Sequence, residues 1–376
     1  MNDGRTGIAA LAQDLEKQRR VLERRCPPYA RALELLPAVL EGPPGRYLEA
    51  AWAHRRFFSP YDRPLLLLDA IRADARAEGA GHPLFPAFTG PSPDAAAVTP
   101  AALESALDPA RERLYDALAR RTVQTNETSR AVAWLWPAAL AGASDGGRPL
   151  ALADIGASAG LNLIADALPS PWRFSDGSPV PVARAIQAVA RLGLDASPLD
   201  ATRAEDADWL RACIWPGEVQ REERLEAALA AFAAARTRPD APVLLPIAAG
   251  NVPARLGILS GAETGALVIA YQTVVRDYLS PDERAEYTGG MNDWLATHPV
   301  GQAVWVELEF HPGDVPELPC GLIAHVRATG GEVRTLVLAR SSYHPALLEP
   351  DAPAAAELAR ILRQPPRAQV AASAAP

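Results

Sequence analysis

The sequence predicts an α/β protein in which a helical N-terminal region precedes a mostly parallel, Rossmann-like sheet. Three observations predict this class. Between residues 7 and 141, apolar residues recur every three to four positions, as in amphipathic helices. From residue 148 onward, short apolar runs alternate with helical segments, which is typical of parallel strands joined by crossover helices. Residues 320–329 and 332–344 flank Gly330-Gly331, the pattern of an antiparallel C-terminal hairpin.

These patterns predict three regions: an α-helical N-terminal or cap domain over 1–147, a Rossmann-like domain over 148–350, and a C-terminal helix with a disordered tail over 351–376. The strands expected before the hairpin are 149–156, 188–195, 241–250, 265–272 and 303–310. The helices expected between them are 159–168, 209–215, 218–236 and 280–298.

The composition narrows the class of partner. The chain has 376 residues, of which 49% are hydrophobic and 22% charged, as in soluble globular proteins. Its net charge of −8 disfavours a nucleic-acid partner, because such binding depends on clustered Lys and Arg. We therefore expect a small-molecule substrate and no nucleic acid. The oligomeric state stays open.

Localisation and metal content are predicted from absent patterns. No basic region followed by an apolar run opens the chain, and no apolar stretch reaches the roughly 18 residues of a membrane helix. We therefore expect a cytoplasmic protein without membrane contact. The three cysteines are widely separated, and the six histidines show no ligand spacing with them, so we expect no disulfide framework and no metal.

The stretch ADIGASAGLN, residues 153–162, supports two hypotheses. Gly156, Ser158 and Gly160 form G-x-S-x-G, the nucleophile elbow of serine hydrolases. The same residues, preceded by Asp154, form a glycine-rich loop after a strand, where the backbone can approach a cofactor. The hydrolase hypothesis has candidate bases and orienting carboxylates downstream, but no HGGG-like oxyanion loop upstream. They are His298, His311, His325, His344, Asp277 and Asp293.

The cofactor hypothesis requires an acidic residue at the end of a second strand, where it can accept hydrogen bonds from ribose hydroxyls. Asp195 in GLDASP meets this requirement, although it follows Asp154 by 41 residues, more than the ~20 of a compact dinucleotide unit. A loop over 168–182 accounts for the excess, and Asp176 within it is the competing acid. The nicotinamide fingerprint is absent, because Ser158 and Leu161 stand where it needs glycine.

The DIGASAG segment resembles the first motif of class I S-adenosylmethionine-dependent methyltransferases. GLDASP resembles their second motif, and AAGN, ending in Asn251, resembles their third. The resemblance implies a seven-stranded sheet whose last strand is an antiparallel insertion, with S-adenosylmethionine as cofactor. The cofactor-binding residues that it implies are Asp154, Gly156, Ser158, Gly160, Asn162, Asp195 and Asn251.

A wider set of motifs is similar to the bacterial domain-of-unknown-function family 2332. The set comprises Q-T-N-E-x-x-R at 124–130, G-A-S-A-G-L-N at 156–162 and W-P-x-x-x-x-R at 215–221. This resemblance runs from about Arg20 to Pro345. It implies a methyltransferase-like protein but specifies no reaction.

Other polar residues near the predicted strands are candidates for substrate contact and catalysis. Asn126 and Arg130 are candidate substrate-binding residues and Glu127 a candidate catalytic residue; the alternative is a capped helix with an exposed ion pair. Tyr271 and Gln272 end a predicted strand, so we expect catalysis from Tyr271 and substrate contact from Gln272, with an amphipathic helix start as the alternative.

One further pair depends on burial. Glu307 and Glu309 share a strand face, where one can be a general base if desolvated; a solvent-facing or salt-bridged pair is the alternative. The function we favour is an S-adenosylmethionine-dependent methyltransferase with a small-molecule acceptor that the sequence does not identify. The alternatives are a serine hydrolase using Ser158 and a non-catalytic nucleoside-binding protein.

Overall fold

The chain folds into two compact units. A computed structural model describes residues 8–57, 59–259, 265–311, 313 and 315–364. The helical unit comprises Met1–Thr125 and Thr202–Glu226, and the sheet unit comprises Asn126–Ala201 and Ala227–Pro376. These ranges differ from the expected domains, because residues 126–147 belong to the sheet unit and residues 202–226 to the helical unit. A helical period predicts a helix but does not show which core its apolar face joins.

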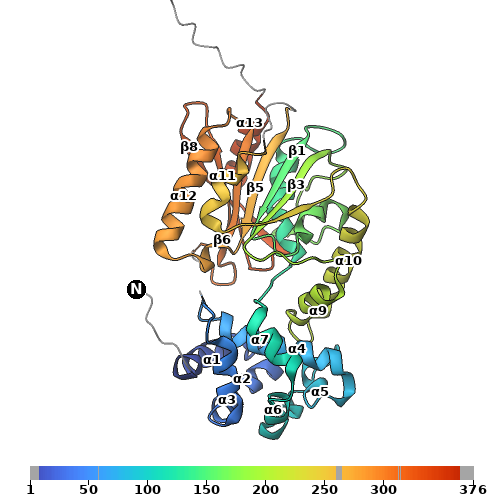
Figure 1. Ribbon diagram of the computed structural model, residues 1–376. Coiled ribbons are helices and arrows are strands. Elements are labelled where there is room, and N and C mark those ends of the chain that lie inside the picture. Colours follow the sequence, from blue (N-terminus) through green and yellow to red (C-terminus); the bar gives the residue numbers. More distant parts are fainter. Residues whose placement is uncertain (1–7, 58, 260–264, 312, 314, 365–376) are drawn as a thin grey trace, which may run out of the picture. The chain divides into compact units, whose positions relative to one another are not determined.

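The helical unit is built from short helices, several of which begin with proline (Figure 1). Proline lacks an N–H and has a fixed φ, so it suits the first helical position. The α-helices are α1 (Ile8–Leu22), α2 (Pro27–Leu40), α3 (Pro43–Trp52), α4 (Asp62–Glu78), α5 (Phe85–Phe88), α6 (Pro100–Ala106), α7 (Glu112–Arg120) and α9 (Ala204–Ala212). Two 3₁₀ turns are η1 (Gly79–Gly81) and η2 (Ala95–Ala97), and α10 (Val219–Ala235) carries the chain into the sheet unit.

The sheet unit contains one nine-stranded sheet in the order β2-β9-β8-β7-β6-β5-β1-β3-β4. The strands are β1 (Leu150–Ile155), β2 (Arg173–Phe174), β3 (Ala188–Asp195), β4 (Val243–Pro246), β5 (Leu267–Thr273), β6 (Ala303–Phe310), β7 (Cys320–Arg327), β8 (Val333–Ser341) and β9 (Leu347–Pro350). The five expected strands are parallel neighbours, and β7 and β8 form the expected antiparallel hairpin. The short strands β2 and β9 were not predicted.

The sheet differs from the one that the methyltransferase resemblance implies. It has nine strands instead of seven. The antiparallel neighbour of β6 is β7, the next strand along the chain, so no later strand inserts beside β6. The coarser prediction of a mostly parallel α/β sheet is confirmed.

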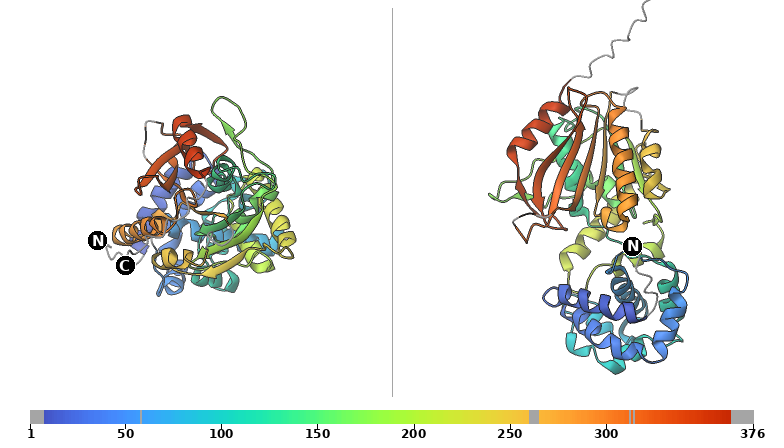
Figure 2. Two further views of the ribbon diagram at one scale, coloured as in Figure 1. Left: turned by 90° about the horizontal axis from the view of Figure 1, so that it is seen from above. Right: turned by 90° about the vertical axis from the view of Figure 1, so that its left-hand side faces the viewer.

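Helices cover both faces of the sheet. The helices of this unit are α8 (Val132–Leu140), α11 (Val252–Leu256), α12 (Pro281–Ala296) and α13 (Ala352–Leu362), with 3₁₀ turns η3 (Thr128–Ala131), η4 (Leu161–Ala167), η5 (Ala249–Asn251) and η6 (Arg276–Tyr278). Figure 2 shows α12 and α13 on opposite faces. Ala153 and Ile155 join the core that contains Met291 of α12. Asp154 lies between them in β1 and therefore points to the other face.

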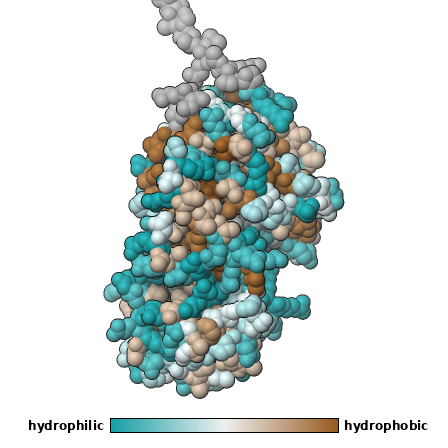
Figure 3. Space-filling view, turned by 90° about the vertical axis from the view of Figure 1, so that its right-hand side faces the viewer, coloured by the Kyte–Doolittle hydropathy of each residue, from teal (hydrophilic) through white to brown (hydrophobic). Residues whose placement is uncertain are grey.

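The next feature is the distribution of hydrophobic residues along the helices and over the surface. No helix among the described residues is long and apolar enough to cross a membrane. Figure 3 shows hydrophobic side chains in scattered patches on one face of the sheet unit. Val189, Val243 and Ile258 are among the exposed large hydrophobic residues of this unit. Scattered patches of this kind are ordinary for a folded protein.

Close packing at Gly193 gives a test of the sheet. Gly193 pairs with Asp154 of β1, and an added Cβ would overlap Leu244 Cδ2 and lie 3.0 Å from Ala157 Cβ. We expect Gly193→Ala to lower the free energy of unfolding by about 1–3 kcal/mol through overpacking, measured by urea denaturation. Gly250→Ala is the matched control, because its Cβ would meet nothing within 4 Å. Equal stabilities of the two variants would contradict this packing.

Candidate functional site

The loop after β1 is the centre of the candidate site. Gly156, Ser158 and Gly160 have φ values of +75°, +52° and +71°, in the left-handed region that favours glycine. An added Cβ would lie 2.7 Å from Val275 Cγ2 at Gly156 and 2.7 Å from Leu244 Cδ2 at Gly160. Both glycines are therefore needed for close backbone packing. The α-helix predicted over 159–168 was wrong, because the chain forms the 3₁₀ turn η4 there.

Asp195 ties this loop to the neighbouring strand. Its Oδ2 atom accepts a hydrogen bond from the backbone N–H of Ser158 at 2.8 Å, and its Oδ1 atom accepts one from Ser197 N–H at 2.8 Å. A carboxylate has about four lone-pair sites, so two remain for ligand hydroxyls. The competing acid, Asp176, lies in the turn after β2, at the other end of the strand order.

Asn126 approaches the loop from the segment before η3. Its Nδ2 atom donates to Ser158 Oγ at 2.5 Å. His325, which has a buried carboxylate partner, lies on β7, and two strands separate β7 from β1. Strand spacing places it roughly 14 Å from β1. His325 therefore does not supply the base that a hydrolase centred on Ser158 requires.

Among the described residues, two buried acceptors without a hydrogen-bond partner lie around the same loop, Asn126 Oδ1 and Asn162 Oδ1. A buried polar atom without a partner costs about 1–3 kcal/mol, so each needs a water molecule or a ligand group. Asp154 Oδ2 and the Tyr271 hydroxyl are also buried, but these two groups interact with each other. The sequence patterns predicted these residues as candidates, and the fold brings them to one place.

Asp154 is itself buried, and its protonation depends on that burial. Burial raises the pKa of its carboxyl to about 8, and the charge of Asp195 adds to the increase, whereas the neighbouring Tyr271 phenol lowers the pKa. Tyr271 pairs with Asp154 across β1 and β5 and is fully buried, with its ring centroid 6.5 Å from that of Trp134. The structure thus places Tyr271 in the core, beside Asp154 and on the strand next to β1.

Gln272 has a different place from the one expected. Its Nε2 atom donates to Glu309 at 2.9 Å, and its Oε1 atom accepts from Tyr287 at 2.5 Å and from Trp305 at 3.1 Å. The side chain is fully buried. These contacts assign Gln272 to a core network and not to a substrate surface, because both ends of its amide are occupied within the protein.

The acidic pair on β6 is buried and belongs to this network. Glu309 accepts a hydrogen bond from Val275 N–H at 2.8 Å, and burial raises its pKa to about 7. Glu307 pairs with Arg276 at 2.7 Å and His325 at 2.7 Å. The alternation of Glu307 and Glu309 on one face signalled this pair, but Arg276 carried no signal in the sequence because its role depends on the turn after β5.

The Q-T-N-E-x-x-R segment is packed against the sheet unit. Glu127 is buried and caps η3 by accepting from Ser129 N–H at 3.0 Å. Arg130 is also buried, and its Nε atom donates to Tyr343 O at 2.9 Å. The exposed ion pair of the alternative is therefore wrong, whereas its capped helical start is present as η3. Both residues order the segment that carries Asn126.

A cavity of about 450 Å³ adjoins the end of β4. Its walls include Asn251 and the apolar side chains of Leu245, Ile247 and Ile258. Ile247 N–H donates to Asp195 O at 2.7 Å, so the cavity and the Asp195 loop are neighbours. This places Asn251, the residue predicted from the third motif, in a concave site next to Asp195.

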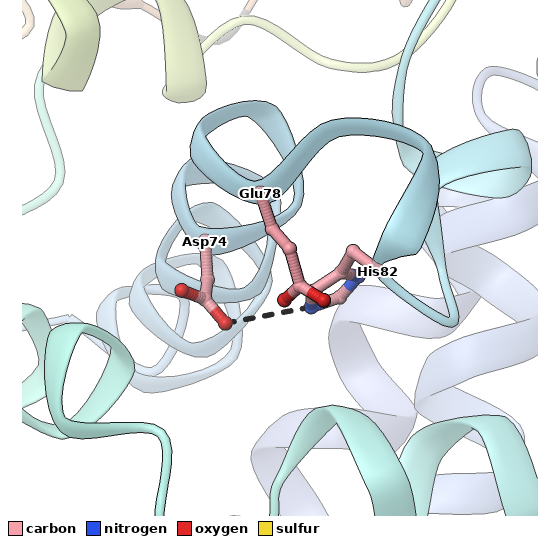
Figure 4. A group of neighbouring side chains, drawn as sticks. All are labelled: Asp74, Glu78 and His82. Atoms are coloured by element: carbon pink, nitrogen blue, oxygen red, sulfur yellow. Dashed lines mark ion pairs between the residues drawn. The ribbon is translucent and has the colours of Figure 1, made fainter.

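One group of metal-ligating side chains occurs among the described residues, in the helical unit (Figure 4). Asp74, Glu78 and His82 point toward one another, but the Arg111 guanidinium bridges Asp74 at 2.9 Å and Glu78 at 2.6 Å. His82 Nδ1 accepts from Leu84 N–H at 3.1 Å, so the ring proton lies on Nε2, the atom that faces Asp74. The arrangement is that of an ion-pair cluster, because arginine and a protonated Nε2 occupy the positions that a cation needs.

The raised pKa of Asp154 gives a test of its burial. In the unfolded chain this carboxyl ionises near pH 3.9, and in the folded protein only near pH 8. The folded state therefore binds the extra proton between these values, and stability falls as pH rises through them. Asp154→Asn cannot ionise, so we expect its Tm relative to wild type to rise between pH 5 and pH 8.5. A difference in Tm that does not change with pH would contradict a buried neutral carboxyl.

The comparisons with known proteins come down to one match. No curated protein and no solved structure matches the chain. The family model described as an uncharacterized protein conserved in bacteria (DUF2332) matches residues 12–349. This range includes the loop after β1, Asp195, Asn251 and the segment that carries Asn126. The chain belongs to the DUF2332 family.

Proposed function

We propose that the sheet unit binds S-adenosylmethionine and transfers its methyl group to a small-molecule acceptor. The observation that carries the proposal is the loop after β1, whose left-handed conformation at Ser158 is held by Asp195 and which is bordered by the amide oxygens of Asn126 and Asn162, two buried acceptors without a partner among the described residues. The loop lies at the carboxyl end of β1. The sheet continues from β1 to β5 and β6 on one side and to β3 and β4 on the other, so the strand order changes direction at β1. Ligands of open α/β sheets bind at such switch points.

The residues around the loop fit the parts of this cofactor. Asp195 retains acceptor sites for ribose hydroxyls. The apolar side chains of Leu245, Ile247 and Ile258 in the cavity suit a purine ring. Asn251 and Arg255, which also line the cavity, supply polar groups for the ring edge. Gly156 is exposed and has no side chain, so its backbone can approach the amino-acid portion. Asn162 Oδ1 and Asn126 Oδ1 are acceptors that still need donors.

The chain's own contribution to catalysis would be positioning. S-adenosylmethionine supplies a methyl group on a sulfonium, which is already a strong electrophile. Asn126 holds Ser158, and Glu127 and Arg130 hold the segment that presents Asn126. Asp154 of β1 and Tyr271 of β5 are buried neighbours in the strands next to the loop. Fixing the acceptor in line with the methyl group lowers the entropic part of the barrier, and an acceptor that is soft or neutral needs no strong base.

Calorimetric titration with S-adenosylmethionine and S-adenosylhomocysteine tests the proposal. We expect micromolar binding to wild type and at least tenfold weaker binding to Asp195→Asn, since a charged acceptor for ribose hydroxyls is lost. Asp176→Asn is the matched control: an exposed acid of the same unit, beyond the loop. No binding to wild type, or equal losses in both variants, would refute the proposal.

The serine hydrolase alternative makes an opposite prediction for Ser158. Replacing Ser158 by Ala removes the hydroxyl that accepts from Asn126, and the loss of such a hydrogen bond costs about 1 kcal/mol, so we expect cofactor affinity to change less than tenfold. We also expect no label when wild type is treated with a fluorophosphonate and analysed by mass spectrometry. A covalent adduct on Ser158 would favour the hydrolase.

A further inference from the structure

The helical unit contains its own cavity, of about 940 Å³. This volume lies within the range of roughly 300–1,000 Å³ found for small-molecule sites. The walls come from α4, α7, α9 and the segment 85–94, all in the helical unit. A ligand of this cavity is therefore independent of the function proposed for the sheet unit.

The walls of the cavity combine aromatic rings with small side chains. Trp209 is buried, and its Nε1 atom donates to Thr122 O at 2.9 Å, so its ring is held in place. Phe85 adds a second ring. Ala73, Ala77 and Ala117 line the wall and leave space between the helices. Such a lining favours a planar ligand, which gains contact area with little loss of conformational entropy.

Three of the four acidic residues that line the cavity are paired with arginines, and the fourth, Asp94, accepts from Ala96 N–H at 2.9 Å. Asp116 pairs with Arg120, Glu205 with Arg203, and Asp208 with Arg211. None of these three arginines lines the cavity. The paired carboxylates therefore do not offer a strong site for a cation.

Arg76 differs from the other arginines that line the cavity. Arg113 donates to Asp74 at 3.3 Å, and Arg121 pairs with Asp206. In the described part of the chain, Arg76 donates no hydrogen bond, and its ion pair with Glu222 Oε1 measures 4.0 Å. The same oxygen already binds Arg72.

Two other arginines lie close enough to Arg76 to act on its charge. Burial lowers the pKa of Arg76, and Arg72 and Arg211 contribute in the same direction, while Glu222 and Asp208 oppose them. About a third of the side chain, 34%, is exposed. An oxyanion next to Arg76 would relieve this repulsion and occupy the planar fork of the guanidinium.

We propose that this cavity binds a small aromatic oxyanion, with its ring against Trp209 and Phe85 and its anionic group on Arg76. The ligand class is a flat aromatic ring that carries a carboxylate, sulfonate or phosphate group. It requires both the aromatic wall and the guanidinium, so neither an apolar molecule nor a simple anion satisfies the whole site.

The dye 8-anilinonaphthalene-1-sulfonate is a suitable probe, because it combines aromatic rings with an anionic group and fluoresces when bound. We expect saturable binding to the full chain. Arg76→Gln should weaken binding about tenfold through loss of a charge-assisted contact. Ala77→Phe should abolish it by filling the cavity. Arg31→Gln, on an exposed arginine paired with Glu34 outside the cavity, should leave it unchanged.

A neutral analogue separates this site from a merely apolar one. N-phenyl-1-naphthylamine has the same rings without the sulfonate, so it should bind wild type at least tenfold more weakly and respond little to Arg76→Gln. The melting temperature of each variant shows whether it is folded. Absence of dye binding, equal binding by folded Arg76→Gln and wild type, or equal affinity for both dyes would each overturn the proposal.

Discussion

The hydrogen bond from Ser158 N–H to the Asp195 carboxylate is the constraint on which the candidate site depends. It joins the loop after β1 to the end of β3 and orders three residues in left-handed conformations. Only glycine adopts such a conformation at little cost, so Ser158 needs a specific partner to remain there. Asp195 supplies that partner, and Asn126 supplies a second one at the hydroxyl.

A second network supports the loop from the other side. Glu309 holds the turn after β5 by its backbone, and Val275 in that turn leaves no room for a side chain at Gly156. Val274, just before it, has a φ of +58°, which is costly for a β-branched residue. The buried carboxylates of β6 thus position the turn after β5, and this turn borders the glycine loop. They do so although β5 separates β6 from β1 in the sheet.

Much of this architecture could be predicted from the sequence. Short apolar runs separated by helical segments located seven of the nine strands, because strands covered on both faces, such as β1, β5 and β6, are buried along almost their whole length. The loop after β1 and Asp195 were found from spacing. Gln272 was assigned to the wrong environment, since position at a strand end does not show which face the side chain takes. Tyr271 and Glu127 are also buried. Tertiary packing determines the exposure of these side chains, and no local sequence pattern predicts it.

The divided composition of the helical unit bears on how the protein folds during synthesis. Residues 202–226 complete this unit, yet they follow three strands of the sheet unit, β1, β2 and β3, in the chain. The surface of α4 that packs against α9 therefore stays uncovered while those strands emerge from the ribosome. An N-terminal fragment ending near residue 147 would lack Trp209 and expose that surface to aggregation. The helical unit can consequently be completed only after these strands of the sheet unit have been synthesised, whatever ligands each unit binds.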